Sequence, residues 1–205
     1  MVQAPNPRRV RIFLAEKGIE IERVEIDIPA GQNRTPEYLA INPRGVVPTL
    51  RLDDGSIIDE SIAICRYFEG LQAEPNLMGR DAREAATIEM WQRHVEFDGM
   101  FQVASIFRNT APHFAARAHP GSAPDLPQIA ALAERGRALV PRFFDMLEKQ
   151  LANNAFVAGD RFTVADISAL VTVDFARWVK VRVPESCVQL HRWYAAVSAR
   201  PSAAA

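Results

Sequence analysis

The sequence predicts two units, a mixed α/β unit over residues 1–74 and an all-helical unit over residues 81–205. Three observations lead to this prediction. Residues 24–28 alternate between apolar and charged side chains, residues 49–58 resemble a short hairpin, and from residue 81 onward the apolar residues recur at helical spacing. The chain-breaking residues of the stretch 75–80 indicate a linker between the two units.

The composition is that of an ordinary soluble protein. The 205 residues are 48 % hydrophobic and 24 % charged with a formal net charge of −1, so a nucleic-acid partner is not expected. No apolar run approaches the ~18 residues that a membrane span needs, and no signal peptide opens the chain, so no membrane partner is expected. The only cysteines, Cys65 and Cys187, lack redox or metal spacing, which favours a cytoplasmic protein. Cys65 lies among apolar residues and is expected to be buried rather than reactive.

The first unit carries local signals for two helices and a strand before its hairpin. Asn6 suits the N-cap of a helix and Pro7 its first position, while Gly18 suits its end. Residues 24–28 predict a half-buried strand. Residues 35–37, Thr-Pro-Glu, cap a second, short helix that ends near residue 42.

The stretch 41–64 organises this unit. It contains Val47-Pro48 at a bent strand edge, then the hairpin, then Glu60-Ser61 where the returning strand meets an apolar helix. A helix N-terminus binds anions because its first backbone N–H groups have no partner in the helix. Taken alone, Pro48 is also consistent with an ordinary strand start, and Glu60-Ser61 with a plain helix cap.

The second unit is predicted to consist of helices over residues 81–111 and 126–153, with Pro141 as a candidate kink, and a helix that begins after Thr163. Thr163 and Asp166 form an Asp version of the capping box, and the apolar residues on either side suit a hydrophobic staple. The expected role of this motif is structural.

Two of these motifs resemble a known family. NPRGVVPTL followed by DESIAI resembles the glutathione-binding half of cytosolic glutathione S-transferases, and GDRFTVADI resembles a motif of their helical domain. The resemblance covers nearly the whole chain. It implies the glutathione S-transferase fold: an N-terminal thioredoxin-like domain over residues 1–74, followed by a helical-bundle domain over residues 81–205. It also implies a homodimer.

The resemblance assigns glutathione-binding roles to the residues at matching positions. The backbone of Val47 would pair with the cysteinyl unit, beside a cis Pro48. Glu60 would bind the γ-glutamyl amine, and Ser61 with the helix N-terminus would bind the γ-glutamyl carboxylate. Asn33 matches a position that contacts the glycine end in some classes. The electrophile pocket is expected at two aromatic residues of the helical domain, Phe101 and Phe107.

The residue that activates the thiol is expected at the start of the first helix. At an ordinary pKa of about 8.5, only about 3 % of a thiol is ionised at neutral pH, so the site must lower that pKa. Family members usually use Tyr, Ser or Cys, and residues 1–10 contain none of these. The stretch resembles a bacterial Thr-Pro-Asn subgroup with Ala4 in place of Thr, which makes Asn6 the candidate catalytic donor; the alternative is a plain N-cap. Only three residues precede Ala4 where relatives have a strand of about six, so the first strand is either short or missing from the sequence, and the latter is favoured.

These observations predict an enzyme that conjugates glutathione, its co-substrate, to small hydrophobic electrophiles. Two alternatives stay open: a glutathione-dependent peroxide or disulfide reductase, and a non-catalytic glutathione-fold binding protein. The four histidines share no metal-ligand spacing, so no metal is expected.

Overall fold

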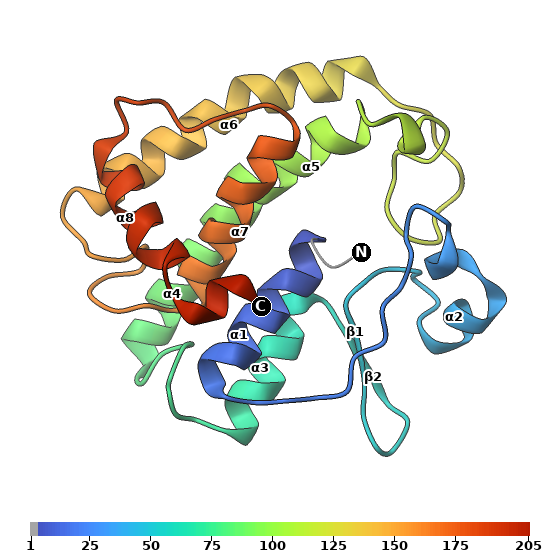
Figure 1. The fold of residues 1–205 in the computed structure, drawn as a ribbon, viewed down its shortest axis with the longest axis horizontal. Helices are drawn as coiled ribbons and strands as arrows, with labels where there is room; N and C mark the ends of the chain where they lie inside the picture. Colours follow the sequence, from blue (N-terminus) through green and yellow to red (C-terminus); the bar gives the residue numbers. More distant parts are fainter. Residues whose placement is uncertain (1–3) are drawn as a thin grey trace.

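The computed structural model describes residues 4–205 and shows the predicted architecture (Figure 1). A small N-terminal part with a two-stranded sheet and helices precedes a larger helical part. Helix α1 (Pro5–Lys17) packs against α3 (Ser61–Leu71) on one side and against α7 (Val164–Trp178) of the helical part on the other. This helix therefore joins the cores of the two parts.

The N-terminal part contains the predicted hairpin. Strand β1 (Thr49–Arg51) pairs antiparallel with β2 (Ile57–Asp59), and the register places Thr49 opposite Asp59. Gly55, at φ +85°, supplies the left-handed residue that the turn requires. Between α1 and the hairpin lie a 3₁₀ turn, η1 (Gln32–Arg34), and the short helix α2 (Pro36–Ile41). The side chain of Thr35 caps α2 as predicted, accepting a hydrogen bond from the Tyr38 N–H at 3.3 Å.

Helix α1 begins earlier than the sequence suggested, so the prediction that Asn6 is its N-cap is wrong. The helix starts at Pro5, and its N-cap is Ala4, which has extended backbone angles (φ −57°, ψ 131°). Proline disfavours the α-helical region for the residue before it, so the first of two closely spaced prolines sets the start of the helix. Gly18 ends the helix in the left-handed conformation, as expected.

The strand predicted over residues 24–28 is not present, because residues 19–28 of the described chain belong to neither strand nor helix. Val24 is 77 % exposed, so its apolar side chain covers no core. Alternation of apolar and polar residues makes a strand only where a neighbouring strand can take its backbone hydrogen bonds. Within residues 4–205 the hairpin strands pair only with each other.

The helical part contains α4 (Ala82–His94), α5 (Phe101–Arg108), α6 (Ala130–Leu151), α7 and α8 (Val188–Ser198). It also contains the short turns η3 (Pro112–Phe114) and η4 (Pro201–Ala204). A π-helical segment, η2 (Val95–Met100), divides the single helix predicted over residues 81–111. At Gly99 in this segment, an added Cβ would lie 2.7 Å from the Phe143 ring. The glycine thus lets η2 approach α6 closely.

Helix α7 is the centre of the helical part, with apolar residues buried on all sides. The predicted capping box at its start is confirmed by the two reciprocal bonds between Thr163 and Asp166. The Asp166 carboxylate also accepts hydrogen bonds from the Val157 N–H and the Trp193 Nε1–H, both at 2.8 Å. Burial raises the pKa of Asp166 to about 6, and the hydrogen bonds that its carboxyl accepts from Val157, Trp193 and Thr163 oppose this rise.

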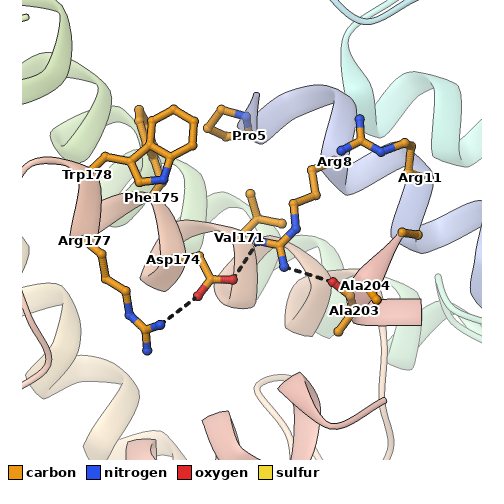
Figure 2. Close-up of a pocket in the computed structure, with 11 residues that line it drawn as sticks. Pro5, Arg8, Arg11, Val171, Asp174, Phe175, Arg177, Trp178, Ala203 and Ala204 are labelled. Carbon is orange, nitrogen blue, oxygen red and sulfur yellow. Dashed lines mark hydrogen bonds and ion pairs between the residues drawn. The ribbon is translucent and has the colours of Figure 1, made fainter. Parts of the chain in front are cut away.

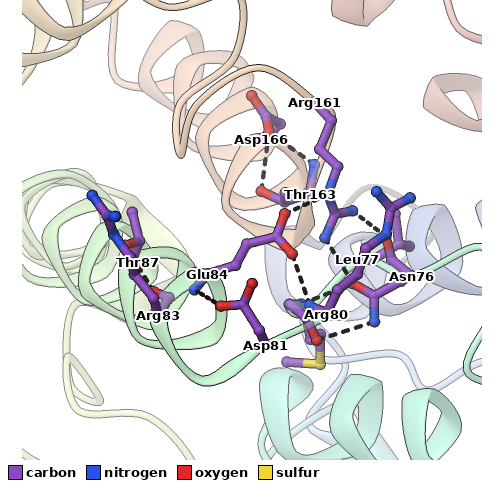
Figure 3. A network of polar contacts seen from close by, with 12 residues as sticks. Asn76, Leu77, Arg80, Asp81, Arg83, Glu84, Thr87, Arg161, Thr163 and Asp166 are labelled. Carbon is purple, nitrogen blue, oxygen red and sulfur yellow. Dashed lines mark hydrogen bonds and ion pairs between the residues drawn. The ribbon is translucent and has the colours of Figure 1, made fainter.

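A second polar network connects Asn76 to α4 and to the loop before α7 (Figure 3). Arg161 donates from Nε to a Glu84 oxygen of α4 at 2.6 Å and from Nη2 to the Asn76 side chain at 2.7 Å. It also donates to the Asn76 carbonyl. The Arg161 hydrogen bond lowers the pKa of Glu84 to about 2. The segment that leaves α3 is therefore held against the helical part by charge-assisted hydrogen bonds.

Candidate functional site

The turn before β1 presents an open backbone. The Val47–Pro48 peptide bond is cis, as predicted. The carbonyl of Val46 anchors this turn by accepting from the Tyr38 hydroxyl at 2.6 Å and from the Thr49 hydroxyl at 3.1 Å. By contrast, no hydrogen bond within residues 4–205 uses the backbone N–H or C=O of Val47. Both groups can therefore pair with an extended peptide-like ligand.

A loop of the helical part holds this turn from outside. Ser122 donates from its backbone N–H to the Arg44 carbonyl at 2.8 Å and from its hydroxyl to the Pro43 carbonyl at 2.6 Å. Gly45 lies at φ +62°, and a Cβ there would lie 2.9 Å from the Ser122 nitrogen. At Gly121 a Cβ would lie only 2.1 Å from the Arg44 oxygen. The two loops therefore approach each other as closely as backbone permits.

The corner between β2 and α3 carries the charged and polar side chains. Glu60 has a left-handed backbone (φ 70°), which is rare for a residue with a side chain and costs about 1–3 kcal/mol. Its exposed carboxylate accepts a hydrogen bond from Arg44 Nη1 at 2.9 Å. Ser61 is buried, and its hydroxyl has no partner among the described residues. The first helical N–H that bonds back is that of Ile64, so the N–H groups of residues 61–63 are open to an anion.

The hairpin register brings the turn and the corner together. Because Thr49 pairs with Asp59, the residues one step further, Pro48 and Glu60, lie opposite each other at the open end of the hairpin. Asn33 contacts the chain just before this turn, where its Nδ2 donates to the Gly45 carbonyl at 2.7 Å. The donor of Asn33 therefore holds the turn, while its buried Oδ1 has no partner among the described residues.

The start of α1 offers few donors. Pro5 and Pro7 have no N–H, and the Arg8 N–H bonds to the Ala4 carbonyl at 3.1 Å, which leaves the N–H of Asn6 as the open backbone donor of the first turn. The Asn6 side chain is exposed, and its Oδ1 accepts from Arg9 Nη2 at 2.7 Å. This contact turns the amide NH₂ of Asn6 away from Arg9 and leaves it available.

Arg9 is a site residue that the sequence analysis missed. It is 4 % exposed and donates to Glu96 at 2.6 Å as well as to Asn6, so it connects the start of α1 to the π segment η2. Helical periodicity gives no sign of this role, because the partner comes from a distant part of the chain. The only local signal is a second arginine directly after Arg8 on a face that the helix buries.

The two aromatic residues predicted for the electrophile pocket lie in different places. Phe107 belongs to an aromatic cluster, with ring centroids 5.4 Å from Phe114, 5.4 Å from Phe175 and 5.7 Å from Trp178. Phe101 is 59 % exposed and stacks on a different ring, that of Phe97. Residues six positions apart on a helix point to different faces, so the structure does not bring Phe101 and Phe107 together. Phe175 and Trp178 were missed because helical spacing alone marks them only as core.

A cavity of about 450 Å³ lies between the start of α1 and the end of α7 (Figure 2). Its apolar side is formed by Pro5, Phe175 and Trp178, next to the aromatic cluster. Its polar side includes Asp174, which accepts hydrogen bonds from Arg8 at 2.6 Å and from the Tyr194 hydroxyl at 2.6 Å. The volume falls within the ~300–1,000 Å³ usual for small-molecule sites.

Neither cysteine is placed for chemistry. Cys65 is fully buried, as predicted, and burial raises the pKa of its thiol to about 12. Cys187 is also buried and free. Across residues 4–205 no group of His, Cys, Asp or Glu side chains is arranged to hold a metal ion. In the same part of the chain, every helix is too short or too polar to cross a bilayer.

Comparison with known proteins gives a consistent result. A family model described as the glutathione S-transferase N-terminal domain matches residues 4–71, and one for the C-terminal domain matches residues 108–201. Glutathione S-transferase 2 of Saccharomyces cerevisiae is 36 % identical, over 97 % of this chain and 83 % of the yeast protein. The crystal structure of a glutathione S-transferase domain-containing protein from Marinobacter aquaeolei VT8 is 37 % identical with a TM-score of 0.89, covering 97 % of this chain and 95 % of that one. The crystal structure of Gtt2 from Saccharomyces cerevisiae is 34 % identical with a TM-score of 0.89, covering 98 % and 94 %. This chain therefore belongs to the glutathione S-transferase family.

Proposed function

We propose that this protein binds glutathione at the open end of the hairpin and transfers it, through its thiol, to a small hydrophobic electrophile. The observation that carries this proposal is the placement of two open binding elements side by side: the unpaired backbone of Val47 and the open N-terminus of α3. Val47 pairs with the cysteinyl unit beside Pro48. Glu60 binds the γ-glutamyl amine, and Ser61 with the helix N-terminus binds the γ-glutamyl carboxylate.

Asn6 is the proposed donor to the thiolate. Lowering a thiol pKa by about two units requires ~2.7 kcal/mol of differential stabilisation. One hydrogen bond to a charged group supplies ~1.5–3 kcal/mol, and a helix N-terminus adds ~0.3–1 kcal/mol. The free NH₂ and the open backbone N–H of Asn6 supply both kinds of interaction from one residue.

The electrophile is proposed to bind at the aromatic cluster around Phe107 and in the adjoining cavity. This region lies next to Pro5, at the helix start that carries Asn6. Asn33 is proposed to act near the glycine end of glutathione, where its donor already holds the turn. Phe101, the other residue predicted for the electrophile pocket, is proposed to lie in a contact with a second protein chain instead, because its exposed ring stacks on Phe97.

Titration calorimetry with glutathione, followed by a conjugation assay with 1-chloro-2,4-dinitrobenzene, tests this function. Binding with conjugation above the uncatalysed rate supports it. The non-catalytic alternative is favoured by Ala4, which has no hydroxyl to offer, and it predicts binding without conjugation. Turnover of cumene hydroperoxide without conjugation would identify the reductase instead. Cytoplasmic localisation is proposed from the composition.

A further inference from the structure

Arg108 is a charged side chain without a counter-ion at the edge of the aromatic cluster. It is the last residue of α5, and its guanidinium carbon lies 5.2 Å from the centroid of the Phe114 ring. Within residues 4–205 no carboxylate pairs with this guanidinium, and the bond between Gln128 and this residue goes to its backbone carbonyl rather than its side chain. Burial lowers the pKa of Arg108 to about 10, so it is still charged at neutral pH.

The neighbouring arginines show the usual arrangement. Arg8 pairs with Asp174, and Arg9 pairs with Glu96, each at 2.6 Å. Arg108 is half-buried, so its guanidinium keeps part of its water but gains no counter-ion from the described residues, which is unfavourable. The stacking on Phe114 recovers only part of the cost of this desolvation. The missing partner is therefore expected to be a bound anion.

The position of Arg108 relative to the cluster defines the shape of the ligand. From Arg108 the aromatic contacts lead through Phe114 and Phe107 to Trp178, which lines the cavity beside Pro5. The Phe114 ring itself is buried, so an aromatic ligand would pack beside the half-buried ring of Phe107, with one end toward Arg108 and the other toward the start of α1. The charged side chains of the cavity lining are Arg8, Arg11, Arg177 and Asp174, and Asp174 already pairs with Arg8.

We propose that the electrophile site selects aromatic electrophiles that carry a carboxylate, and that Arg108 is the residue that binds this carboxylate. This inference rests on the proposed transferase function, because it assigns the substrate class of the same site. In the reaction, the glutathione thiolate attacks a ring carbon that bears chlorine. The C–S bond forms, the C–Cl bond breaks, and chloride leaves with the bonding electron pair, so no oxidant or reductant is needed.

A matched pair of substrates tests the proposal: 4-chloro-3,5-dinitrobenzoate and its neutral methyl ester. For each, kcat/KM is divided by the uncatalysed rate constant to remove the difference in intrinsic reactivity. The wild-type protein is expected to favour the carboxylate at least tenfold by this measure. Arg108→Gln should lose that preference, and Arg108→Lys should keep part of it. Arg83→Gln, which removes an exposed charge on α4, is the control and should keep all of it.

A binding measurement separates this inference from the proposed function. The unreactive 3,5-dinitrobenzoate and its methyl ester are titrated into the protein by calorimetry, with and without glutathione. Tighter binding of the acid in the wild type, abolished in Arg108→Gln, supports the carboxylate site even if no conjugation is observed. Equal binding of acid and ester, or a preference for the acid that survives Arg108→Gln, would overturn it, whatever the conjugation assay shows.

Discussion

At the scale of single residues, the site depends on groups that the protein leaves unpaired. Val47 keeps its backbone open, the Ser61 hydroxyl has no partner among the described residues, and Asn6 keeps its amide NH₂ available. Backbone and buried polar groups are normally satisfied within the protein, so the open groups of Val47 and Ser61 at the hairpin are consistent with a ligand that completes them. Glutathione supplies an amine, two carboxylates, two amides and a thiol.

Glu60→Ala is expected to weaken glutathione binding by about 1.5–3 kcal/mol, the free energy of a hydrogen bond between charged groups, or roughly 10–150-fold in Kd. Titration calorimetry measures this loss. Glu89→Ala removes a half-buried acid of α4 that pairs with Arg93, and it should leave the affinity unchanged. An unchanged affinity in Glu60→Ala would remove Glu60 from the site.

Asn6→Ala is expected to raise the pKa of the bound thiol and lower conjugation at pH 7, with activity recovering toward alkaline pH. Thiolate absorbance of the complex, titrated with pH, measures the pKa. Because Ala4 rather than Asn6 is the N-cap, this substitution should not incur the ~1 kcal/mol of a lost cap. Thr35→Ala removes a true cap on α2 and should lower stability without moving the thiol pKa. A thiol pKa equal in wild type and Asn6→Ala would exclude Asn6 as the donor.

At the scale of elements, the sequence predicted those turns and helix ends that depend on residues a few positions apart. The hairpin, the caps at Thr35 and Thr163, and the end of α1 at Gly18 each depend on residues a few positions apart. The strand over residues 24–28 and the unbroken helix over residues 81–111 were wrong because each depends on distant parts of the chain. The strand needs a neighbour to take its hydrogen bonds, and the interruption in the helix accompanies a contact with Phe143 of α6.

The same limit applies to the site. Residues in the motif 41–64 could be assigned from sequence because the hairpin brings them together over a short stretch of chain. The roles of Arg9, Arg108 and Trp178 could not be assigned from sequence. The contacts that suggest these roles form only when helices distant in the sequence pack together. The start of α1 was also ambiguous by two residues, because two prolines near it both suit the first helical position.

Gly99→Ala is expected to destabilise the protein by ~1–3 kcal/mol, because the new methyl group overlaps the Phe143 ring at 2.7 Å. Urea unfolding followed by circular dichroism measures the change. Gly70→Ala is the matched control. Gly70 lies in α3, and an added Cβ there would meet no atom within 4 Å, so this variant should gain about 0.5–1 kcal/mol. Equal stabilities of wild type and Gly99→Ala would contradict the close approach of η2 and α6.

At the scale of the whole molecule, two surfaces are important. One is the contact between the N-terminal part and the helical part, and the other is the exposed aromatic face of η2 and α5. The contact between the two parts contains the network of Arg161 with Glu84 and Asn76. The predicted linker over residues 75–80 stays a prediction, and Asn76 within it is held by the helical part rather than free. The aromatic face carries the stacked pair Phe97 and Phe101, both more than half exposed.

Acid should weaken the Arg161 network in a defined range of pH. The pKa of Glu84 is lowered from 4.5 to about 2 in the folded protein, so its contribution to stability is present above about 4.5 and is lost as pH falls toward 2. The difference in melting temperature between wild type and Glu84→Gln should therefore be constant above pH 5 and should decrease as the pH falls below 5. A difference that does not change with pH would show that the charge of Glu84 contributes nothing.

The protein is expected to be a homodimer that covers Phe97 and Phe101, since large exposed aromatic patches on soluble proteins mark interaction surfaces. Sedimentation equilibrium of the wild type should give twice the chain mass of 22.8 kDa. The double variant with Phe97→Ser and Phe101→Ser should sediment as a monomer. Val24→Ser, at a residue that is 77 % exposed elsewhere, should stay dimeric. A dimer that survives the double substitution would place the interface on another face.

The contact of Ser122 with the turn at Pro43 and Arg44 also affects how glutathione reaches its site. Loops beside binding sites are often mobile covers that open and close around the ligand. Here two glycines bring the backbones into direct contact, and lifting the loop would break both Ser122 hydrogen bonds at once. We therefore expect this boundary of the site to stay in place when glutathione binds. Hydrogen exchange at the Ser122 amide is expected to be as slow in the free protein as in the glutathione complex. Glutathione is then expected to enter the site from another side.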